Sequence, residues 1–150
     1  MELILWRHAD AEPGGDDLAR ELTPKGRDQA ARVAAWLRKQ LPGDYSVLVS
    51  PAVRAQQTAE ALKVKFQTEK KLAPGASVQT IVKAAGWPDH EGTVVLVGHQ
   101  PDFGVAAAQL VAGARASWSI KKGGLWWLSN RERDEEAQVV VRAVVSPDLL

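Results

Sequence analysis

Apolar residues gather along this chain in short runs separated by longer mixed segments. Nearly continuous apolar runs are typical of strands that are buried on both faces of a sheet. We expect such strands at Leu3–Trp6, Tyr45–Val49 and Thr93–Val97, with a shorter strand at Val64–Phe66.

Between these runs, apolar residues recur at spacings of three and four, which predicts amphipathic helices. Thr23-Pro24 supplies an N-cap followed by proline at the first helical position, and Ser50-Pro51 repeats that signal. The helices that we expect cover residues 24–41, 51–62, 78–85 and about 103–111.

The C-terminal part of the chain has a different pattern. Gly124–Ser129 and Gln138–Val145 read as two strands joined by the charged loop Asn130–Glu136, which predicts a hairpin. Strands that alternate with helices favour an α/β sandwich with a mainly parallel sheet, to which this hairpin adds an antiparallel edge. No interior linker marks a boundary, so we expect residues 1–150 to form a single domain.

Composition narrows the classes of function. Lys and Arg total 19 against 18 Asp and Glu, so no bulk charge draws the chain to nucleic acid or to an anionic membrane. The sequence has no Cys, which excludes disulfides, thiolate metal sites and a Cys nucleophile. It contains neither an apolar run long enough to span a membrane nor a recognisable signal peptide, and we therefore expect a cytoplasmic protein.

Histidine and arginine residues follow the ends of three apolar runs. Arg7 and His8 follow the first run, Ser50 and then Arg54 follow the second, and His99 follows the run that ends at Val97. Ligands of open α/β sheets bind beyond the carboxyl ends of the strands. If these three strands are parallel neighbours, two imidazoles and two guanidiniums therefore face one crevice.

This set of side chains suits phosphoryl transfer. Guanidiniums match the oxygens of a phosphate, and the amides at the start of the helix after Pro51 add further donors. One imidazole can act as a covalent nucleophile, while the other can donate to a phosphoryl oxygen. Phosphoryl transfer depends mainly on positioning and charge neutralisation, which these groups can supply without a metal or another cofactor.

Four motifs, in chain order, resemble the signatures of the histidine phosphatase superfamily, beginning with its Arg-His-Gly motif. The matching segments are Leu5-Trp6-Arg7-His8-Ala9-Asp10-Ala11, Leu22-Thr23-Pro24-Lys25-Gly26, Ser50-Pro51-Ala52-Val53-Arg54-Ala55-Gln56-Gln57-Thr58-Ala59 and Val97-Gly98-His99-Gln100-Pro101. Within that superfamily, the short chain looks most like the SixA-type phosphohistidine phosphatases.

The resemblance implies a role for each matching residue. His8 would be the nucleophile that carries the phosphoryl group, and Arg7, Arg54 and His99 would hold the phosphoryl oxygens. It also implies a three-layer αβα sandwich of the phosphoglycerate mutase type, without a large cap insertion and without a metal. Further candidates for contacts at the rim of the phosphate pocket are Arg20, Thr23 and Ser50.

The chain departs from the family pattern in two ways. Position 9 is Ala where the signature has Gly, so the turn there must be one that Ala accepts. Larger relatives carry a glutamate as general acid in an insertion between the positions of Arg54 and His99. The connection here is short and holds no convincing acid motif, which leaves Asp10 as the candidate for this role.

A site with a poor general acid favours P–N bonds over alkyl phosphate esters. An alkoxide leaving group needs a proton from an acid, whereas the ring of a phosphohistidine can depart neutral if it is already protonated. The short connection also leaves little material for a lid, and an open crevice admits a side chain of another protein. We therefore expect a phosphohistidine-bearing protein as the substrate.

Three alternatives stay open on the sequence alone. One is a small-molecule phosphomonoesterase with the same covalent mechanism, and another is a non-catalytic module that binds a phosphate or a phosphoprotein. The third is a metal-dependent hydrolase, although two guanidiniums in the same crevice would repel a divalent cation. Its ligands would be His8, Asp10, His99 and Asp102.

Overall fold

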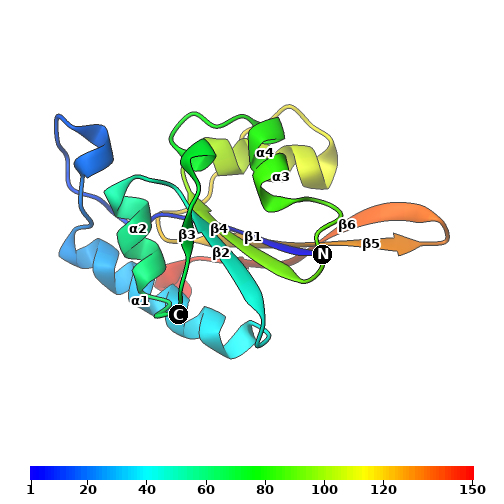
Figure 1. The fold of residues 1–150 in the computed structure, drawn as a ribbon, viewed down its shortest axis with the longest axis horizontal. Coiled ribbons are helices and arrows are strands. Elements are labelled where there is room, and N and C mark those ends of the chain that lie inside the picture. Colours follow the sequence, from blue (N-terminus) through cyan, green and yellow to red (C-terminus); the bar gives the residue numbers. More distant parts are fainter.

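The computed structural model describes residues 1–150 and has one six-stranded sheet with helices on both of its faces (Figure 1). The strands are β1 (Glu2–Arg7), β2 (Tyr45–Val49), β3 (Gln67–Thr68), β4 (Thr93–Gly98), β5 (Leu125–Arg133) and β6 (Glu136–Val145). The helices are α1 (Pro24–Gln40), α2 (Val53–Glu60), α3 (Val78–Ala85) and α4 (Asp102–Ala112). Three short 3-10 helices are η1 (Asp17–Ala19), η2 (Lys70–Leu72) and η3 (Pro147–Leu149).

The strand order is β3-β2-β4-β1-β5-β6. The pairs β2–β3, β2–β4 and β1–β4 are parallel, whereas β5 is antiparallel to both β1 and β6. Val97 of β4 pairs with both Trp6 and Val49, so β1, β2 and β4 end at the same level. The predicted mainly parallel α/β sandwich with an antiparallel C-terminal edge is confirmed.

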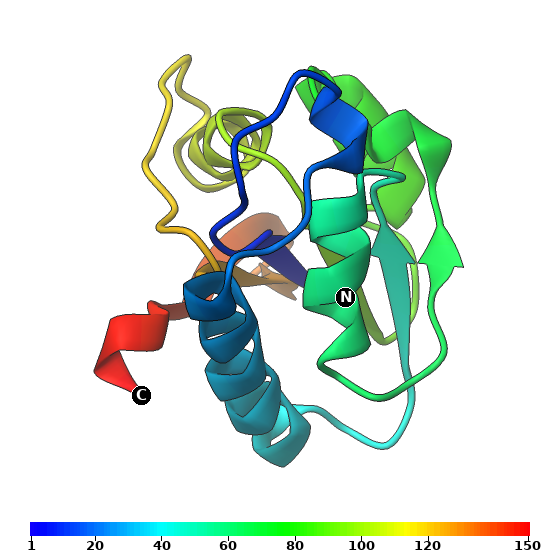
Figure 2. The ribbon, with the colours of Figure 1, turned by 90° about the vertical axis from the view of Figure 1, so that its left-hand side faces the viewer.

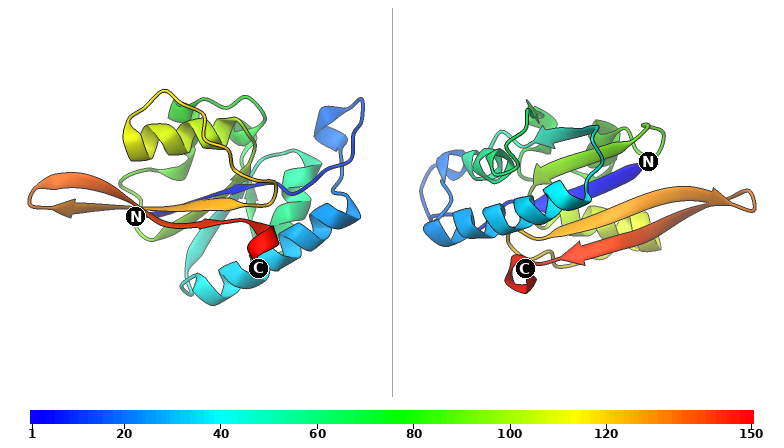
Figure 3. Two further views of the ribbon diagram at one scale, coloured as in Figure 1. Left: turned by 180° about the vertical axis from the view of Figure 1, so that it is seen from behind. Right: turned by 90° about the horizontal axis from the view of Figure 1, so that it is seen from below.

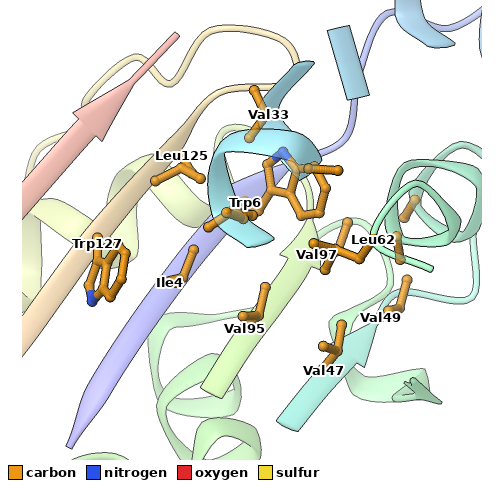
Figure 4. Packing of buried hydrophobic residues seen from close by; sticks show 14 of the residues in the cluster. Ile4, Trp6, Val33, Val47, Val49, Leu62, Val95, Val97, Leu125 and Trp127 are labelled. Atoms are coloured by element: carbon orange, nitrogen blue, oxygen red, sulfur yellow. The ribbon is translucent and has the colours of Figure 1, made fainter. Parts of the chain in front are cut away.

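Two apolar layers hold the helices against the sheet. On one face, Trp6 and Val97 of the sheet pack with Val33 of α1 and with small residues of α2, as Figure 4 shows in part. On the other face, α3 and α4 cover Leu5 and neighbouring residues. Figure 2 shows the two helical layers on opposite sides of the sheet. Because the central strands are buried on both faces, the inner residues Leu3–Trp6 of β1 and Val94–Val97 of β4 are all apolar.

The C-terminal hairpin is longer than the sequence predicts. The ladder between β5 and β6 continues to Arg133–Glu136, so the expected loop 130–136 is mostly strand and the turn has only two central residues. These residues, Asp134 and Glu135, have φ of 53° and 65°, as in the tight turns whose twist suits a hairpin. The hairpin projects beyond the rest of the molecule (Figure 3).

Two further boundaries differ from the prediction. The helix α2 begins at Val53 with Ala52 as its N-cap, so Ser50 and Pro51 are not its cap and first residue. The strand expected at Val64–Phe66 lies slightly later, at Gln67–Thr68. It pairs there with the last two residues of β2, after a chain reversal in which Lys63 has a φ of 58°.

None of the helices combines the length and the apolar character that crossing a bilayer requires.

Candidate active site

The residues that follow β1, β2 and β4 extend the sheet by one further step. The amide of His8 donates to the carbonyl of Gly98 (2.9 Å), and the amide of Ser50 donates to the carbonyl of Val97 (3.0 Å). These backbone bonds hold the starts of the loops side by side. The side chains of His8, Ser50 and His99 consequently meet at the carboxyl end of the parallel strands, as the sequence predicts.

His8 is held with one ring nitrogen available. Its side chain is largely buried, and Nδ1 lies 2.7 Å from the carbonyl oxygen of Ala9, to which it donates. Nε2 therefore keeps its lone pair, and Nε of Arg54 donates to it at 3.3 Å. Burial, together with the charges of Arg54 and Arg7, lowers the pKa of His8 to about 4 despite its bond to Ala9. The ring is neutral at pH 7.

His99 lies beside His8, with 5.2 Å between the ring centroids. Its Nδ1 faces Nη2 of Arg54 at 3.4 Å, and its Nε2 lies 2.7 Å from Oγ of Ser50. Because Arg54 can only donate, Nδ1 is the acceptor and Nε2 donates to Ser50. Burial, followed by the neighbouring His8 and Arg54, lowers the pKa of His99 to about 3.

Arg54 connects the two imidazoles with the loop that follows β1. It lies in the first turn of α2 and is only 4% exposed. Besides its contacts with both histidines, Nη1 donates to the backbone carbonyl of Asp17 at 2.6 Å, and Nη2 lies 3.2 Å from the Asp17 carboxylate. The guanidinium thus forms one wall of the site from a rigid helical position.

Arg7 is a cation without a carboxylate partner. Its Nη1 donates to the carbonyl of Ile120 at 2.7 Å, while its Nε is buried and has no hydrogen-bond partner. Burial lowers the pKa of Arg7, although a guanidinium stays charged at pH 7. A partly desolvated, uncompensated cation beside His8 favours the binding of an anion.

The turn after His8 is fixed by side chains from two helices. The amide of Ala9 donates to Oγ1 of Thr58 in α2 (3.1 Å), and the amide of Asp10 donates to Oε1 of Gln29 in α1 (2.9 Å). Ala9 is fully buried and is not among the residues with positive φ. The turn is therefore one that alanine adopts without strain, and the departure from the family signature leaves the turn intact.

Asp10 is engaged away from the imidazoles. Its carboxylate accepts from Oγ1 of Thr23 and pairs with Nζ of Lys122, each at 2.8 Å. These two hydrogen bonds lower the pKa of Asp10. A carboxylate that is held ionised has no proton to give, so this geometry does not favour the predicted role of Asp10 as general acid.

The three rim candidates take different places. Thr23 is the N-cap of α1, as predicted, and accepts from the amide of Gly26 at 2.9 Å. Ser50 is buried and supports His99 rather than capping α2, although its Oγ does accept from the amide of Ala52 at 3.2 Å. Arg20 pairs with Asp17 at 3.1 Å, so it is linked to Arg54 through that carboxylate.

Two residues of the site were missed by the sequence analysis. Thr58, which orders the turn after His8, lies within the third motif, and its sequence context gives it no separate role. Asp17 is not among the candidates that the sequence offers, yet it contacts Arg54. The available signal was an opposite charge three residues later, Arg20, immediately before the Leu22-Thr23 motif.

The four ligands of the alternative metal site do not come together. No three His, Asp or Glu side chains are placed so that they could hold one metal ion. Asp10 is bound by Thr23 and Lys122, and the carboxylate of Asp102 accepts from the amides at 75 and 76. The donor geometry therefore gives no support to the metal-dependent alternative.

Comparisons with known proteins agree with the geometry. The family model of the histidine phosphatase superfamily (branch 1) matches residues 3–76. The phosphohistidine phosphatase SixA of Escherichia coli (strain K12) is 31% identical over 122 residues, which are 75% of this chain and 76% of that protein. A SixA homolog of Haemophilus influenzae is 30% identical over 126 residues, which are 73% and 77% of the two chains. A solved structure of the protein histidine phosphatase SixA complexed with tungstate superposes with a TM-score of 0.83 at 25% identity, over 99% of both chains.

Proposed function

The chain belongs to the histidine phosphatase superfamily, and from this premise we propose that it is a metal-independent phosphatase that forms a phosphohistidine on His8. One observation carries the proposal. The Nε2 lone pair of His8 is fixed in a buried site that also contains two guanidiniums and a second imidazole. A tetrahedral oxyanion such as the tungstate bound to the related SixA is the kind of ligand that this set would hold.

In the first step, Nε2 of His8 attacks the phosphorus atom. The bond from phosphorus to the leaving atom breaks, and its electron pair goes to that atom. Arg7 and Arg54 neutralise the charge on the phosphoryl oxygens, which is the main catalytic requirement of this reaction. The arriving dianion raises the pKa of His99, so that this ring can also donate to an oxygen.

In the second step, water attacks the phosphorus of the intermediate. The P–N bond breaks, the electron pair returns to Nε2 of His8, and both hydrogens of the water leave with the phosphate. Nδ1 keeps its hydrogen throughout, because it donates to the carbonyl of Ala9. The cycle regenerates the neutral imidazole that the first step needs.

We propose a phosphohistidine on a partner protein as the substrate, acted on by a single domain of residues 1–150 without a large cap. An ionised Asp10 offers no general acid for an alkoxide, whereas a protonated imidazole leaves without one. The related proteins of Escherichia coli and Haemophilus influenzae are described as a phosphohistidine phosphatase and its homolog. Both points favour P–N bonds.

The test is a comparison of wild type with His8→Ala, using a ³²P-phosphorylated histidine domain and a panel of small phosphate esters. We expect acid-labile label on the wild-type protein and no label or turnover with His8→Ala. The exposed third histidine provides the control, because His90→Ala should behave as wild type. A wild-type protein that binds the phosphorylated domain but shows neither label nor release of phosphate would indicate a binding module. A higher kcat/KM for esters would indicate a small-molecule phosphomonoesterase.

A further inference from the structure

The carboxylate of Asp17 lies on the solvent side of the site. It belongs to η1, and Arg54 contacts both its backbone carbonyl (2.6 Å) and its carboxylate (3.2 Å). The Asp17 side chain is 59% exposed, whereas the Arg54 side chain is only 4% exposed. A negative charge is thus held on the exposed side of a site that contains the buried cation of Arg54.

The position of η1 is fixed by more than this one contact. Arg20 binds the second oxygen of the Asp17 carboxylate at 3.1 Å, and its Nη1 donates to the carbonyl of Glu12 at 3.2 Å. Slight burial raises the pKa of Asp17, but Arg54 and Arg20 outweigh it and lower that pKa below its usual range. Asp17 is therefore a carboxylate, which can accept hydrogen bonds but cannot supply a proton.

The leaving group of a substrate extends toward the side of the site on which this charge lies. An in-line displacement places the leaving atom opposite Nε2 of His8. The floor of the site is formed by His8, His99 and Arg54, which are all buried, so the leaving group extends toward the exposed side. Asp17 lies on that side and contacts the guanidinium that would bind the phosphoryl group.

We propose that Asp17 determines substrate specificity by favouring leaving groups that carry a positive charge, such as the protonated imidazole of a phosphohistidine. This inference rests on the proposed function and extends it. The carboxylate accepts the N–H of the ring nitrogen that is not bonded to phosphorus. A neutral alcohol gains less from this contact, and an anionic phenolate is repelled by it.

The proposal accounts for turnover without a general acid. When Nε2 of His8 attacks, the P–N bond of the substrate breaks and its electron pair goes to the ring nitrogen. The other ring nitrogen already carries a hydrogen, so the ring leaves as neutral imidazole and no proton moves in that step. Asp17 is a carboxylate before and after the reaction, and its effect is to keep the substrate ring protonated beforehand.

The experiment compares Asp17→Asn with Asp16→Asn on two substrates, a phosphorylated histidine domain and p-nitrophenyl phosphate. Both variants remove one negative charge from the same loop, but the Asp16 side chain makes no hydrogen bond or ion pair. For Asp17→Asn we expect kcat/KM to fall about tenfold on the histidine domain and to stay level or rise on the aryl ester. Asp16→Asn should change neither value by more than about twofold.

The dependence of kcat/KM on pH gives a second measurement, which would not change if Asp17 had only a structural role. Removing the carboxylate lowers the pKa of the bound ring, so the alkaline limb of the histidine-domain profile should move down by about one pH unit in Asp17→Asn. An equal fall on both substrates with an unmoved profile would mean that Asp17 only orients Arg54, and the proposal would be wrong. If the wild type cleaves the aryl ester but no phosphohistidine, the proposed function itself fails and this inference fails with it.

Discussion

At the scale of single residues, the site depends on keeping two histidines neutral beside two arginines. Burial lowers the pKa of His8 to about 4 and that of His99 to about 3, so neither ring adds charge to a pocket that already holds Arg54 and Arg7. A protonated His8 would lack the lone pair that a nucleophile needs. The same desolvation that preserves the nucleophile therefore couples the site to the stability of the fold.

We predict that acid destabilises the folded chain through these two rings. An unfolded histidine titrates near pH 6.5, so between pH 6.5 and about 4 the unfolded chain binds more protons than the folded one. As the pH is lowered through this range, the free energy of unfolding should fall by up to about 1.4 kcal/mol per histidine for each pH unit. Urea unfolding at pH 7.5 and pH 5 measures this, with His8→Asn/His99→Asn as the control. An equally steep fall in that double variant would contradict the assignment.

The sequence predicts the principal chemistry at this scale but not its support. Arg7, His8, Arg54 and His99 can be placed together because each follows the end of a buried strand or begins the next helix. The contact of Asp17 with Arg54 has no such marker, since it depends on how a loop folds back over α2. Loop conformation is set by contacts distant in sequence, and no periodic pattern records it.

At the scale of elements, the start of α1 is packed against the loop that carries the nucleophile. A Cβ atom built on Gly26 would lie 2.0 Å from the carbonyl oxygen of Asp10, two residues after His8. Backbone atoms approach one another so closely here that only glycine fits. The glycine at the end of the second motif, in the first turn of α1, therefore has a structural reason: it allows α1 to pack against this loop.

We predict that Gly26→Ala lowers both activity and stability, although alanine is the better helix former. The added methyl group must displace either α1 or the turn after His8, so we expect a loss of at least about 2 kcal/mol in unfolding free energy and a kcat/KM at least about tenfold lower. Gly43→Ala is the matched control, because nothing lies within 4 Å of its Cβ position. Chemical unfolding and a turnover assay measure both effects, and an unchanged activity would show that the loop tolerates the shift.

Capping signals predict elements well when the cap acts alone. Thr23 caps α1 as its sequence indicates, and α3 spans Val78–Ala85 as expected. The same signal at Ser50-Pro51 misplaces the start of α2, since Ser50 Oγ is bound to His99. A residue that is recruited to the site no longer follows the local rule, and the helix begins with the following residues instead.

At the scale of the whole molecule, the site and the tip of the C-terminal hairpin lie at opposite ends of the sheet. The strands β1, β2 and β4 end at the site. The strand β5 runs antiparallel to β1, and its residue Ser129 pairs with Glu2 at the start of β1. The hairpin beyond that point extends past the start of β1, away from the site, as Figures 1 and 3 show. Changes at the tip of the hairpin should therefore leave the chemistry unaffected.

We predict that replacing Asp134-Glu135 by Asn-Gly stabilises the fold without changing kcat/KM. Both residues have positive φ, a conformation that is unfavourable for most side chains and is preferred by Asn and Gly in two-residue hairpin turns. The gain should be about 0.5–1 kcal/mol in the free energy of unfolding, which thermal and urea unfolding can measure. Val-Val at the same two positions is the opposing control and should destabilise the hairpin, because β-branched residues tolerate this backbone poorly. An independent hairpin can alter the fraction of folded chain but not the activity of each folded molecule. If kcat/KM per folded molecule changes together with stability in both variants, the two ends of the sheet are coupled.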